Sequence, residues 1–192
     1  MKKAFTILVI IFELFGLAYG QDAQDKQKFE RFVDSAIKRL PPAAFPQLPK
    51  AIVRSLDAHG CTVPQTYSDP SPHNVIKGEF RSRGQKDWAV LCSISGMSSI
   101  WIFWRGSANA ISKIAGETDL TYLQDVDGHG TPGFSRSIEV VGKDYIIEHY
   151  KAYNGLKPPP INHQGIDDGH LEKASTVRYY YRGKWLELHG AD

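Results

Sequence analysis

The sequence predicts an α+β fold in which an N-terminal helical pair packs on a mainly antiparallel β-sheet. Two amphipathic helical segments come first. Apolar strand-like runs separated by turn residues then fill 74–105, and a two-residue turn predicts a hairpin over 176–189. We therefore expect a single globular domain over 21–192, with its helical part at about 22–60 and its sheet part at about 74–192.

Residues 1–20 are typical of a secretory signal peptide. Two lysines precede an apolar run at 4–17, and 18–20 form a small-x-small cleavage pattern. A membrane-spanning helix is less favoured, because the run is shorter than the ~20 residues a bilayer requires and contains Glu13. We expect cleavage before Gln21, export to the periplasm or the extracellular space, and no stable membrane anchor afterwards.

The charge of the chain is nearly balanced, with 23 Lys and Arg against 21 Asp and Glu. Such a balance offers no electrostatic basis for binding nucleic acid or an anionic membrane surface, so we expect neither partner.

Two cysteines, Cys61 and Cys92, occur in this chain that we expect to be exported. An oxidising compartment favours a disulfide between them. A reactive thiol is less favoured, because Cys92 lies in an apolar run where a thiolate is destabilised. No CxxC spacing points to zinc.

The helical part contains two elements. Apolar residues at three- and four-residue spacing predict a helix from Asp22 to Leu40, which Pro41 would end. A second helix is predicted from Pro49 to His59, with Gly60 as its C-terminal cap.

The sheet part begins with three strands. They are predicted at Val75–Phe80, Asp87–Ile94 and Ser99–Trp104, with a turn at Ser95-Gly96. Both faces of the second strand are apolar, so we expect it in mid-sheet with both sides covered, one of them by the helices.

Residues 78–90, GEFRSRGQKDWAV, resemble the calcium-binding motif of integrin-alpha-type FG-GAP repeats. Arg81 and Arg83 stand at the oxygen-bearing positions of the family loop. Two cations oppose a calcium ion, which requires oxygen ligands. The resemblance therefore implies strand–loop–strand geometry without the metal.

A wider resemblance covers most of the chain after residue 20. The runs GCTVPQ, NVIKGEF, GQKDWAVLCS and YYYRGKW are similar to those of a family of exported bacterial proteins of uncharacterised function. The resemblance implies secretion and a compact domain, and it carries no activity or site.

Weaker signals follow residue 106. Short strands are predicted at Leu120–Leu123 and Ser137–Val141. A strand at Asp144–His149 is favoured over a helix reaching Tyr153, and Pro158 opens an expected surface connection to about Gly169.

The C-terminal hairpin joins Thr176–Tyr181 to Lys184–His189 through Arg182-Gly183. Its register pairs Tyr180 with Trp185 and Arg178 with Glu187 on one face. Val177, Tyr179, Leu186 and Leu188 share the other face, which we expect to point into the core.

Aromatic side chains on the sheet suggest a binding function. Trp101 and Phe103 are expected in the core, whereas Tyr180 and Trp185 are either core residues or an exposed platform. The leading hypothesis is a non-enzymatic domain that needs no cofactor or metal. It would bind a protein or a cell-envelope glycan through Tyr180, Trp185, Arg178 and Glu187.

The alternative hypothesis is a small hydrolase with a His/Asp site assembled from the loops between 125 and 170. Its candidate residues are His129, His149, His163, His170, Asp167 and Asp168. None shows HExxH spacing, and no GxSxG elbow occurs. Asp125 and Asp127 lack the remaining ligands of an EF-hand and are interpreted as a solvated turn.

Overall fold

The computed structural model describes residue 24 and residues 26–190. The expected signal segment, 1–20, lies outside the described residues. The chain divides into two compact units, 1–35 and 36–192, which are described separately. In the first unit, residues 26–35 are helical.

The first predicted helix is wrong at its C-terminal end. Helical backbone ends at Ser35, and Arg39–Leu40 form strand β1, which pairs antiparallel with β2 (Val63–Pro64). Pro41 disfavours helical backbone at the residue before it. Pairing with β2 then decides the conformation of this segment.

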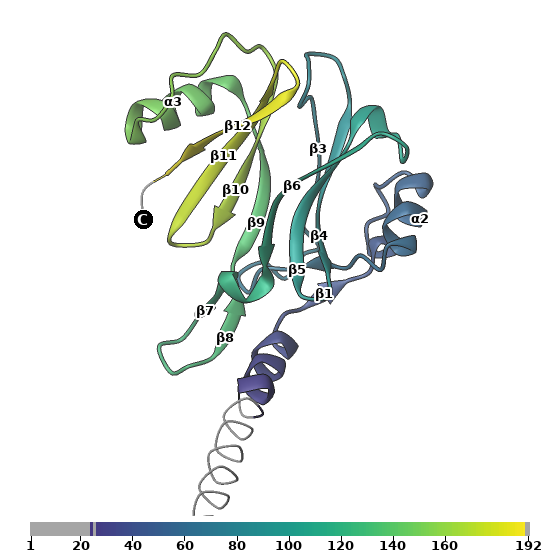
Figure 1. Cartoon of the computed structure of the whole chain (residues 1–192), viewed down its shortest axis with the longest axis vertical. Helices are drawn as coiled ribbons and strands as arrows, with labels where there is room; N and C mark the ends of the chain where they lie inside the picture. The colour runs from purple at the N-terminus through teal and green to yellow at the C-terminus, as the bar shows by residue number, and fades with distance from the viewer. Residues whose placement is uncertain (1–23, 25, 191–192) are drawn as a thin grey trace, which may run out of the picture. The chain divides into compact units, whose positions relative to one another are not determined.

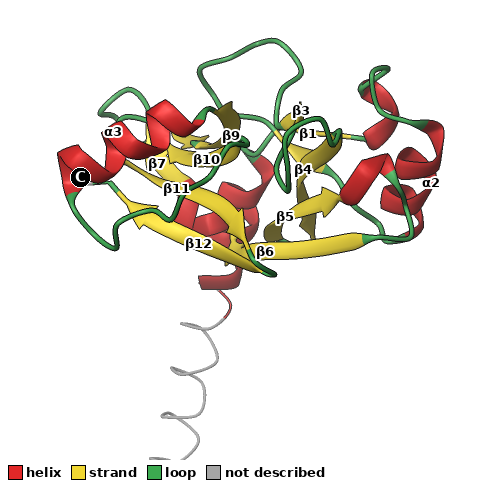
Figure 2. Cartoon of the chain, turned by 90° about the horizontal axis from the view of Figure 1, so that it is seen from above, coloured by secondary structure: helices red, strands yellow, loops and turns green. Residues whose placement is uncertain are grey.

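The second unit is an α+β sandwich of two antiparallel four-stranded sheets with one long helix on each outer side (Figure 1, Figure 2). The first sheet has the order β3 (Val75–Gly78), β4 (Asp87–Ile94), β5 (Met97–Phe103), β6 (Ile111–Thr118). The second has the order β12 (Lys184–His189), β11 (Ala174–Tyr181), β10 (Gly165–His170), β9 (Arg136–Val141).

Smaller elements connect these layers. The short strands β7 (Leu123–Asp125) and β8 (Pro132–Phe134) form a separate hairpin. Single 3-10 turns occur at Pro42–Ala44, Trp104–Gly106 and Asp119–Tyr122.

Helix α2 (Lys50–Ala58) confirms the second predicted helix. Its buried residues, Ile52 and Leu56, face the first sheet. Gly60 adopts a φ of 68°, and the next N–H, that of Cys61, donates to the Leu56 carbonyl at 3.0 Å. This geometry ends the helix in a Schellman motif, as a glycine at this position favours.

The predicted disulfide is present. Cys61 and Cys92 are bonded, with their Cα atoms 5.5 Å apart. The bond ties the end of α2 to the middle of β4 and lies within the core between helix and sheet.

Strand β4 is buried on both faces, as its pattern predicted. Trp88 and Val90 join the core beneath α2, together with Trp101 and Phe103 of β5. Between the two sheets lies a second core, to which β4 contributes Ala89 and Leu91. The predicted core positions of Trp101 and Phe103 are confirmed, since both are almost completely buried.

The predicted strand at 144–149 is wrong, because this segment lies in helix α3 (Lys143–Tyr153). Ile146 is completely buried against the second sheet, and Tyr150 packs beside it. The helical spacing of these residues prevails because it lets α3 cover the outer face of that sheet.

The expected surface connection after Pro158 is also too long, because Gly165–His170 form the inner strand β10. The sequence GIDDGH has low strand propensity. The first glycine of this segment, Gly165, is required by packing, because a Cβ there would lie 2.7 Å from the Arg178 carbonyl oxygen. Pairing on both sides, with β9 and β11, overrides local propensity here.

The other strand predictions differ from the structure mainly in their bounds. Leu120–Leu123 is largely a 3-10 turn, and β7 starts only at Leu123. Strand β6 had no clear signal in the sequence, because it is a polar edge strand with a bulge opposite Ser98 and Ile100.

Asn74 links the two sheets where their edges β3 and β9 meet. Its side-chain Nδ2 donates to the Arg136 carbonyl at 3.1 Å, and its Oδ1 accepts from the Ile138 N–H at 2.9 Å. Nδ2 also donates to the Pro64 carbonyl at 2.8 Å. All of these bonds are buried, so the Asn74 amide is fully used within the fold.

Candidate ligand-binding site

The cross-strand pair predicted in the hairpin is present, and it contributes to the core between the sheets. Tyr180 pairs with Trp185 in register, and both rings pack against Trp104 of the first sheet. The ring centroids of Trp104 and Tyr180 are 5.0 Å apart, and those of Trp104 and Trp185 are 5.9 Å apart. Both hairpin rings remain partly exposed. They therefore belong to the core and also reach the rim of the sandwich.

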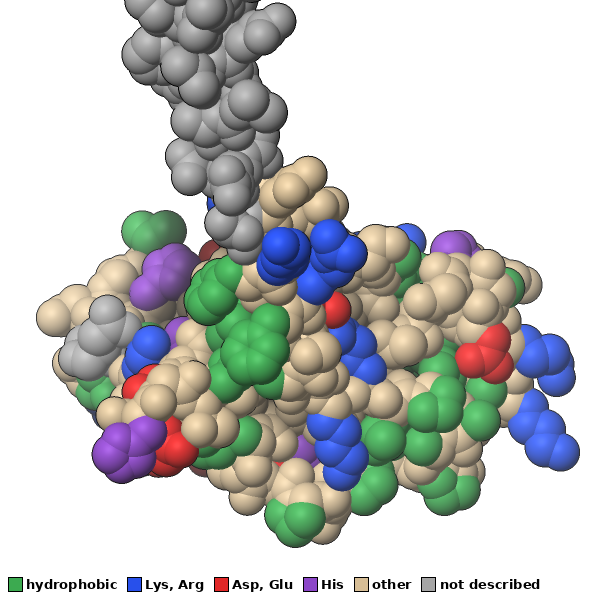
Figure 3. Space-filling view, turned by 90° about the horizontal axis from the view of Figure 1, so that it is seen from below, with side chains coloured by type: hydrophobic (Ala, Val, Ile, Leu, Met, Phe, Trp, Pro, Cys, Tyr) green, Lys and Arg blue, Asp and Glu red, His purple; other side chains and the backbone are tan. Residues whose placement is uncertain are grey.

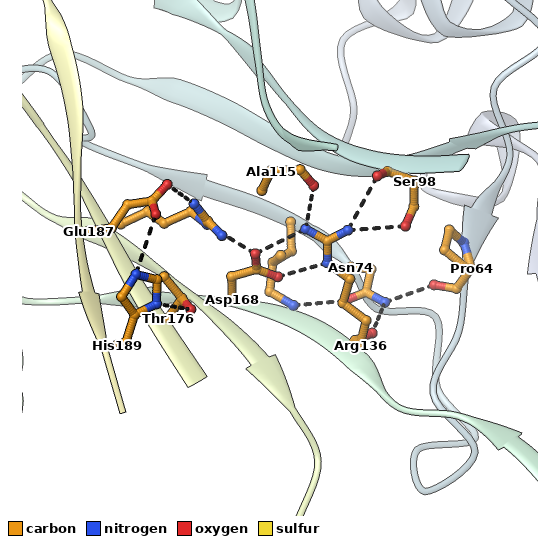
Figure 4. Close-up of polar contacts among 11 residues, drawn as sticks. Pro64, Asn74, Ser98, Ala115, Arg136, Asp168, Thr176, Glu187 and His189 are labelled. Atoms are coloured by element: carbon orange, nitrogen blue, oxygen red, sulfur yellow. Dashed lines mark hydrogen bonds and ion pairs between the residues drawn. The ribbon is translucent and has the colours of Figure 1, made fainter. Parts of the chain in front are cut away.

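The predicted pair Arg178 and Glu187 belongs to a longer ionic network (Figure 4). Arg136 is completely buried and forks onto Asp168, with Nε–Oδ1 at 2.8 Å and Nη2–Oδ2 at 3.0 Å. Arg178 Nε also reaches Asp168 Oδ2, at 3.0 Å, and its Nη1 bonds Glu187. The chain of charges runs from the core to the exposed side of β12, where Glu187 lies 3.8 Å from His189.

The same network joins the two sheets. Arg136 Nη2 donates to the Ala115 carbonyl at 2.8 Å, and Nη1 donates to Ser98 Oγ at 3.1 Å. Burial alone would lower the pKa of Arg136, but hydrogen bonding and charge from Asp168 outweigh it and raise that pKa. Arg178 and Glu187 are thus occupied by structural contacts, and Arg178 is largely buried.

A groove opens at the rim, beside the hairpin turn. Its cavity of about 310 Å³ is lined by Arg81, Tyr180, Arg182 and the connection 160–163, together with Tyr181 and Gly183. The loop after β3 and the β11–β12 turn lie at the same end of the sandwich (Figure 1). The loop is fixed there because Glu79 N–H donates to Gln164 Oε1 at 2.8 Å and Gln164 N–H donates to the Glu79 carbonyl at 3.0 Å.

A second cavity of about 360 Å³ adjoins the first. The two share Asn162 and His163, and the second adds Glu79, Arg83, Lys143 and Gln164. Two such cavities fall within or near the range of about 300–1,000 Å³ typical of small-ligand sites. The two cavities together are called the groove.

Aromatic rings hold the guanidinium groups of the groove. Arg81 lies 5.7 Å from the centroid of Tyr180 and 6.0 Å from that of Trp104. Arg182 lies 5.2 Å from the centroid of Tyr181. These are cation–π distances, so the rings favour placement of the guanidinium groups at the groove.

The six residues of the hydrolase hypothesis lie in different environments. His129 is in the exposed β7–β8 turn, and His163 lines the groove. His170 packs against Tyr122 at a tilted angle, with ring centroids 5.4 Å apart. Asp168 lies between the sheets in the ionic network, whereas Asp167, its neighbour on β10, faces α3.

His149 and Asp167 share one neighbour, Tyr145 of α3. The Tyr145 hydroxyl donates to Asp167 Oδ2 at 2.7 Å, and the Tyr145 and His149 ring centroids are 6.1 Å apart. Burial, together with the bond to Asp167 and its charge, raises the pKa of Tyr145 to about 12. This hydroxyl therefore stays protonated at neutral pH and acts as a hydrogen-bond donor.

The carboxylates of the β7–β8 turn and of segment 78–90 accept hydrogen bonds from nearby groups of the protein. Asp125 Oδ1 accepts from the Gly128 N–H at 3.0 Å, and Asp127 Oδ2 accepts from Thr131 Oγ1 at 2.6 Å. The bond from the Thr131 hydroxyl, followed by that from the His129 N–H, lowers the pKa of Asp127. In segment 78–90, Asp87 accepts the Phe80 N–H at 3.1 Å and also the Arg105 N–H at 2.8 Å. Among the described residues, no group of three His, Cys, Asp or Glu could hold a metal ion.

Most of the groove is not predictable from the sequence. The sequence points to Tyr180 as part of the hairpin pair and to His163 as a hydrolase candidate, and Arg81 only opposes a calcium site. Arg182 lies in the predicted turn, but no sequence pattern places it next to a loop one hundred residues earlier. The opposite end of the sandwich shows charged residues of both signs and histidines scattered among apolar and other surface (Figure 3).

No helix within the described part of the chain is both long enough and apolar enough to span a membrane. Comparison of the chain with protein-family models, with curated proteins and with solved structures finds no match.

Proposed function

We propose that the chain is an exported, non-enzymatic domain that binds a cell-envelope glycan in the groove at the rim of the sandwich. The observation that supports this function is the lining of the groove, where Tyr180 and Tyr181 stand beside Arg81, Arg182 and Asn162. Tyrosine rings offer apolar faces to a sugar ring, while guanidinium and amide groups donate hydrogen bonds to its oxygens.

Export is supported by the signal-like segment and by the Cys61–Cys92 disulfide, which is stable in an oxidising compartment. This binding surface differs from the one that the sequence predicts. Trp185, Arg178 and Glu187 are engaged in packing and ion pairs, whereas Tyr180, which also packs on the core, lines the groove together with Tyr181.

The test is a binding titration of purified protein against a panel of neutral and acidic envelope oligosaccharides. Intrinsic fluorescence is a suitable signal, because Trp104 and Trp185 pack against Tyr180. We expect saturable binding that Tyr181→Ala weakens and that Arg54→Gln leaves unchanged. Arg54 is exposed on α2, on the far side of the first sheet. Absence of binding to every member of the panel at millimolar concentration would refute the proposal.

A further inference from the structure

The groove contains an excess of positive charge that the fold leaves uncompensated. Arg81 and Arg182 line its first cavity, and Arg83 and Lys143 line its second. Within the described part of the chain, none of these four side chains forms an ion pair with a carboxylate. Cations gathered at a concave surface raise the local concentration of anions.

The single carboxylate of the lining does not offset this excess. Glu79 Oε1 bonds Lys86 Nζ at 2.5 Å, and its Oε2 accepts the Gly84 N–H at 2.8 Å. The bond to Lys86, followed by that to Gly84, lowers the pKa of Glu79, and the charge of Arg83 acts in the same direction. The Glu79 charge is thus neutralised by Lys86, which is not part of the lining.

The excess is local, because the whole chain carries a formal charge of only +2. It is also preorganised. Arg81 rests on Trp104 and Tyr180, and Arg182 rests on Tyr181. Side chains already held in place lose less conformational entropy when a ligand binds, so their hydrogen bonds contribute more to affinity.

We infer that the ligand of the groove is an acidic oligosaccharide whose anionic groups pair with Arg81 and Arg182. This inference rests on the proposed function and specifies its ligand class. One sugar ring lies against Tyr180 or Tyr181 in the first cavity. The chain of the ligand continues past Asn162 and His163 into the second cavity, where Arg83 and Lys143 meet the next acidic group.

Guanidinium forks bind both carboxylate and phosphate in bidentate geometry. The acidic groups can therefore be uronate carboxylates or phosphates, and separate ligands distinguish the two sources. A carboxylate series compares oligogalacturonate with its methyl ester, which has the same rings without the charge. A phosphate series compares a phosphorylated oligosaccharide with its dephosphorylated form.

The protein variants are Arg81→Gln and Arg182→Asn, with Arg54→Gln as the matched surface control. Asparagine suits position 182, because the φ there is 46° and Asn tolerates left-handed backbone. The charge-retaining variants Arg81→Lys and Arg182→Lys separate loss of charge from loss of folding, and thermal melting checks that each variant is folded.

We expect the acidic member of at least one series to bind roughly 10- to 100-fold more tightly than its neutral counterpart. Arg81→Gln and Arg182→Asn should each lower the affinity for the acidic ligand about tenfold and reduce the salt dependence of binding. The lysine variants keep the charge but lose the planar fork, so they should keep the salt dependence and lose only part of the affinity. Arg54→Gln should bind like the wild type.

Equal affinity for the charged and neutral members of both series, undiminished in the two arginine variants, would overturn the inference and leave the proposed function intact. Binding of an acidic ligand that is undiminished in Arg81→Gln and in Arg182→Asn would overturn the inference as well, since other cationic groups would then bind the anion. If no member of either series binds, charged or neutral, the proposed function fails together with the inference.

Discussion

Removing the Asp168 carboxylate should destabilise the fold more than any single change at the groove. Arg136 is completely buried, and Asp168 is only 6% exposed. Asp168→Ala deletes three charge-assisted bonds, two from Arg136 and one from Arg178. It leaves the Arg136 charge buried without its counter-charge. Breaking a buried pair in this way costs about 3–5 kcal/mol.

In a domain of this length, each kcal/mol changes the melting temperature by about 2–4 °C, so Asp168→Ala should melt roughly 6–20 °C below the wild type. Circular dichroism or calorimetry measures the shift. The matched control is Asp167→Ala, the next residue on the same strand. It loses one bond from the partly exposed Tyr145, worth about 0.5–1.5 kcal/mol.

A double-mutant cycle isolates the pair. Arg136→Met removes the cation, so the combined variant with Asp168→Ala should cost less than the sum of the single changes, with a coupling energy of about 0.5–3 kcal/mol. Two results contradict this reasoning: an Asp168→Ala melting temperature equal to that of Asp167→Ala, or strictly additive effects in the cycle.

Three further predictions concern other parts of the fold. The difference in tyrosinate absorbance between wild type and Tyr145→Phe, followed against pH, should place the Tyr145 transition at about pH 12. Because folding raises this pKa from 10, the stability that the neutral hydroxyl supplies is complete below pH 10 and is lost as the pH rises towards 12. A transition near 10 would contradict the burial and hydrogen bonding described. Replacing both Cys61 and Cys92 by serine should reduce the free energy of unfolding by about 3–4 kcal/mol in chemical denaturation. Thiol titration of the denatured, unreduced wild type should detect no free thiol, and two reactive thiols would disprove the disulfide. Gly165→Ala should lower the free energy of unfolding by about 1–3 kcal/mol, since its Cβ would lie 2.7 Å from a carbonyl oxygen of the neighbouring strand. In the control Gly116→Ala, the new Cβ would have nothing within 4 Å, so this change should be nearly neutral. Equal melting temperatures of the two variants would refute the packing argument.

Local patterns predicted those parts of the fold whose structure is determined locally. Strand β4 was identified with its observed bounds because its apolar run ends at a two-residue turn, Ser95-Gly96, in which both residues have positive φ. The C-terminal hairpin followed in the same way from its turn, and the register of Tyr180 with Trp185 is as predicted.

The predictions from sequence are wrong where contacts between residues far apart in the chain decide the conformation. The acidic pair in β10 is stable inside a sheet because Arg136 and Arg178 neutralise Asp168, while Asp167 accepts a bond from Tyr145. A window of ten residues contains none of these partners. The same holds for the second sheet as a whole, whose existence depends on pairings that a single-sheet prediction did not include.

The groove could not be predicted from the sequence for a related reason. Its lining brings together Arg81, His163 and Arg182, which belong to three separate segments. Only the aromatic contribution of Tyr180 could be anticipated from the hairpin. Loop residues assembled in this way show no period, and periodicity is the main signal that a single sequence provides.

The Asn74 amide has a consequence for the way the edge of the second sheet is completed. Strand β9 ends its sheet, and a sheet edge leaves backbone groups without a neighbouring strand. The side chain of Asn74 binds two such groups, the Arg136 carbonyl and the Ile138 N–H, and both bonds are buried. A single side chain thus takes the place of a neighbouring peptide. Asn74→Ala would leave both groups buried without a partner, at a cost of about 1–3 kcal/mol for each, and a lower melting temperature would be the expected result.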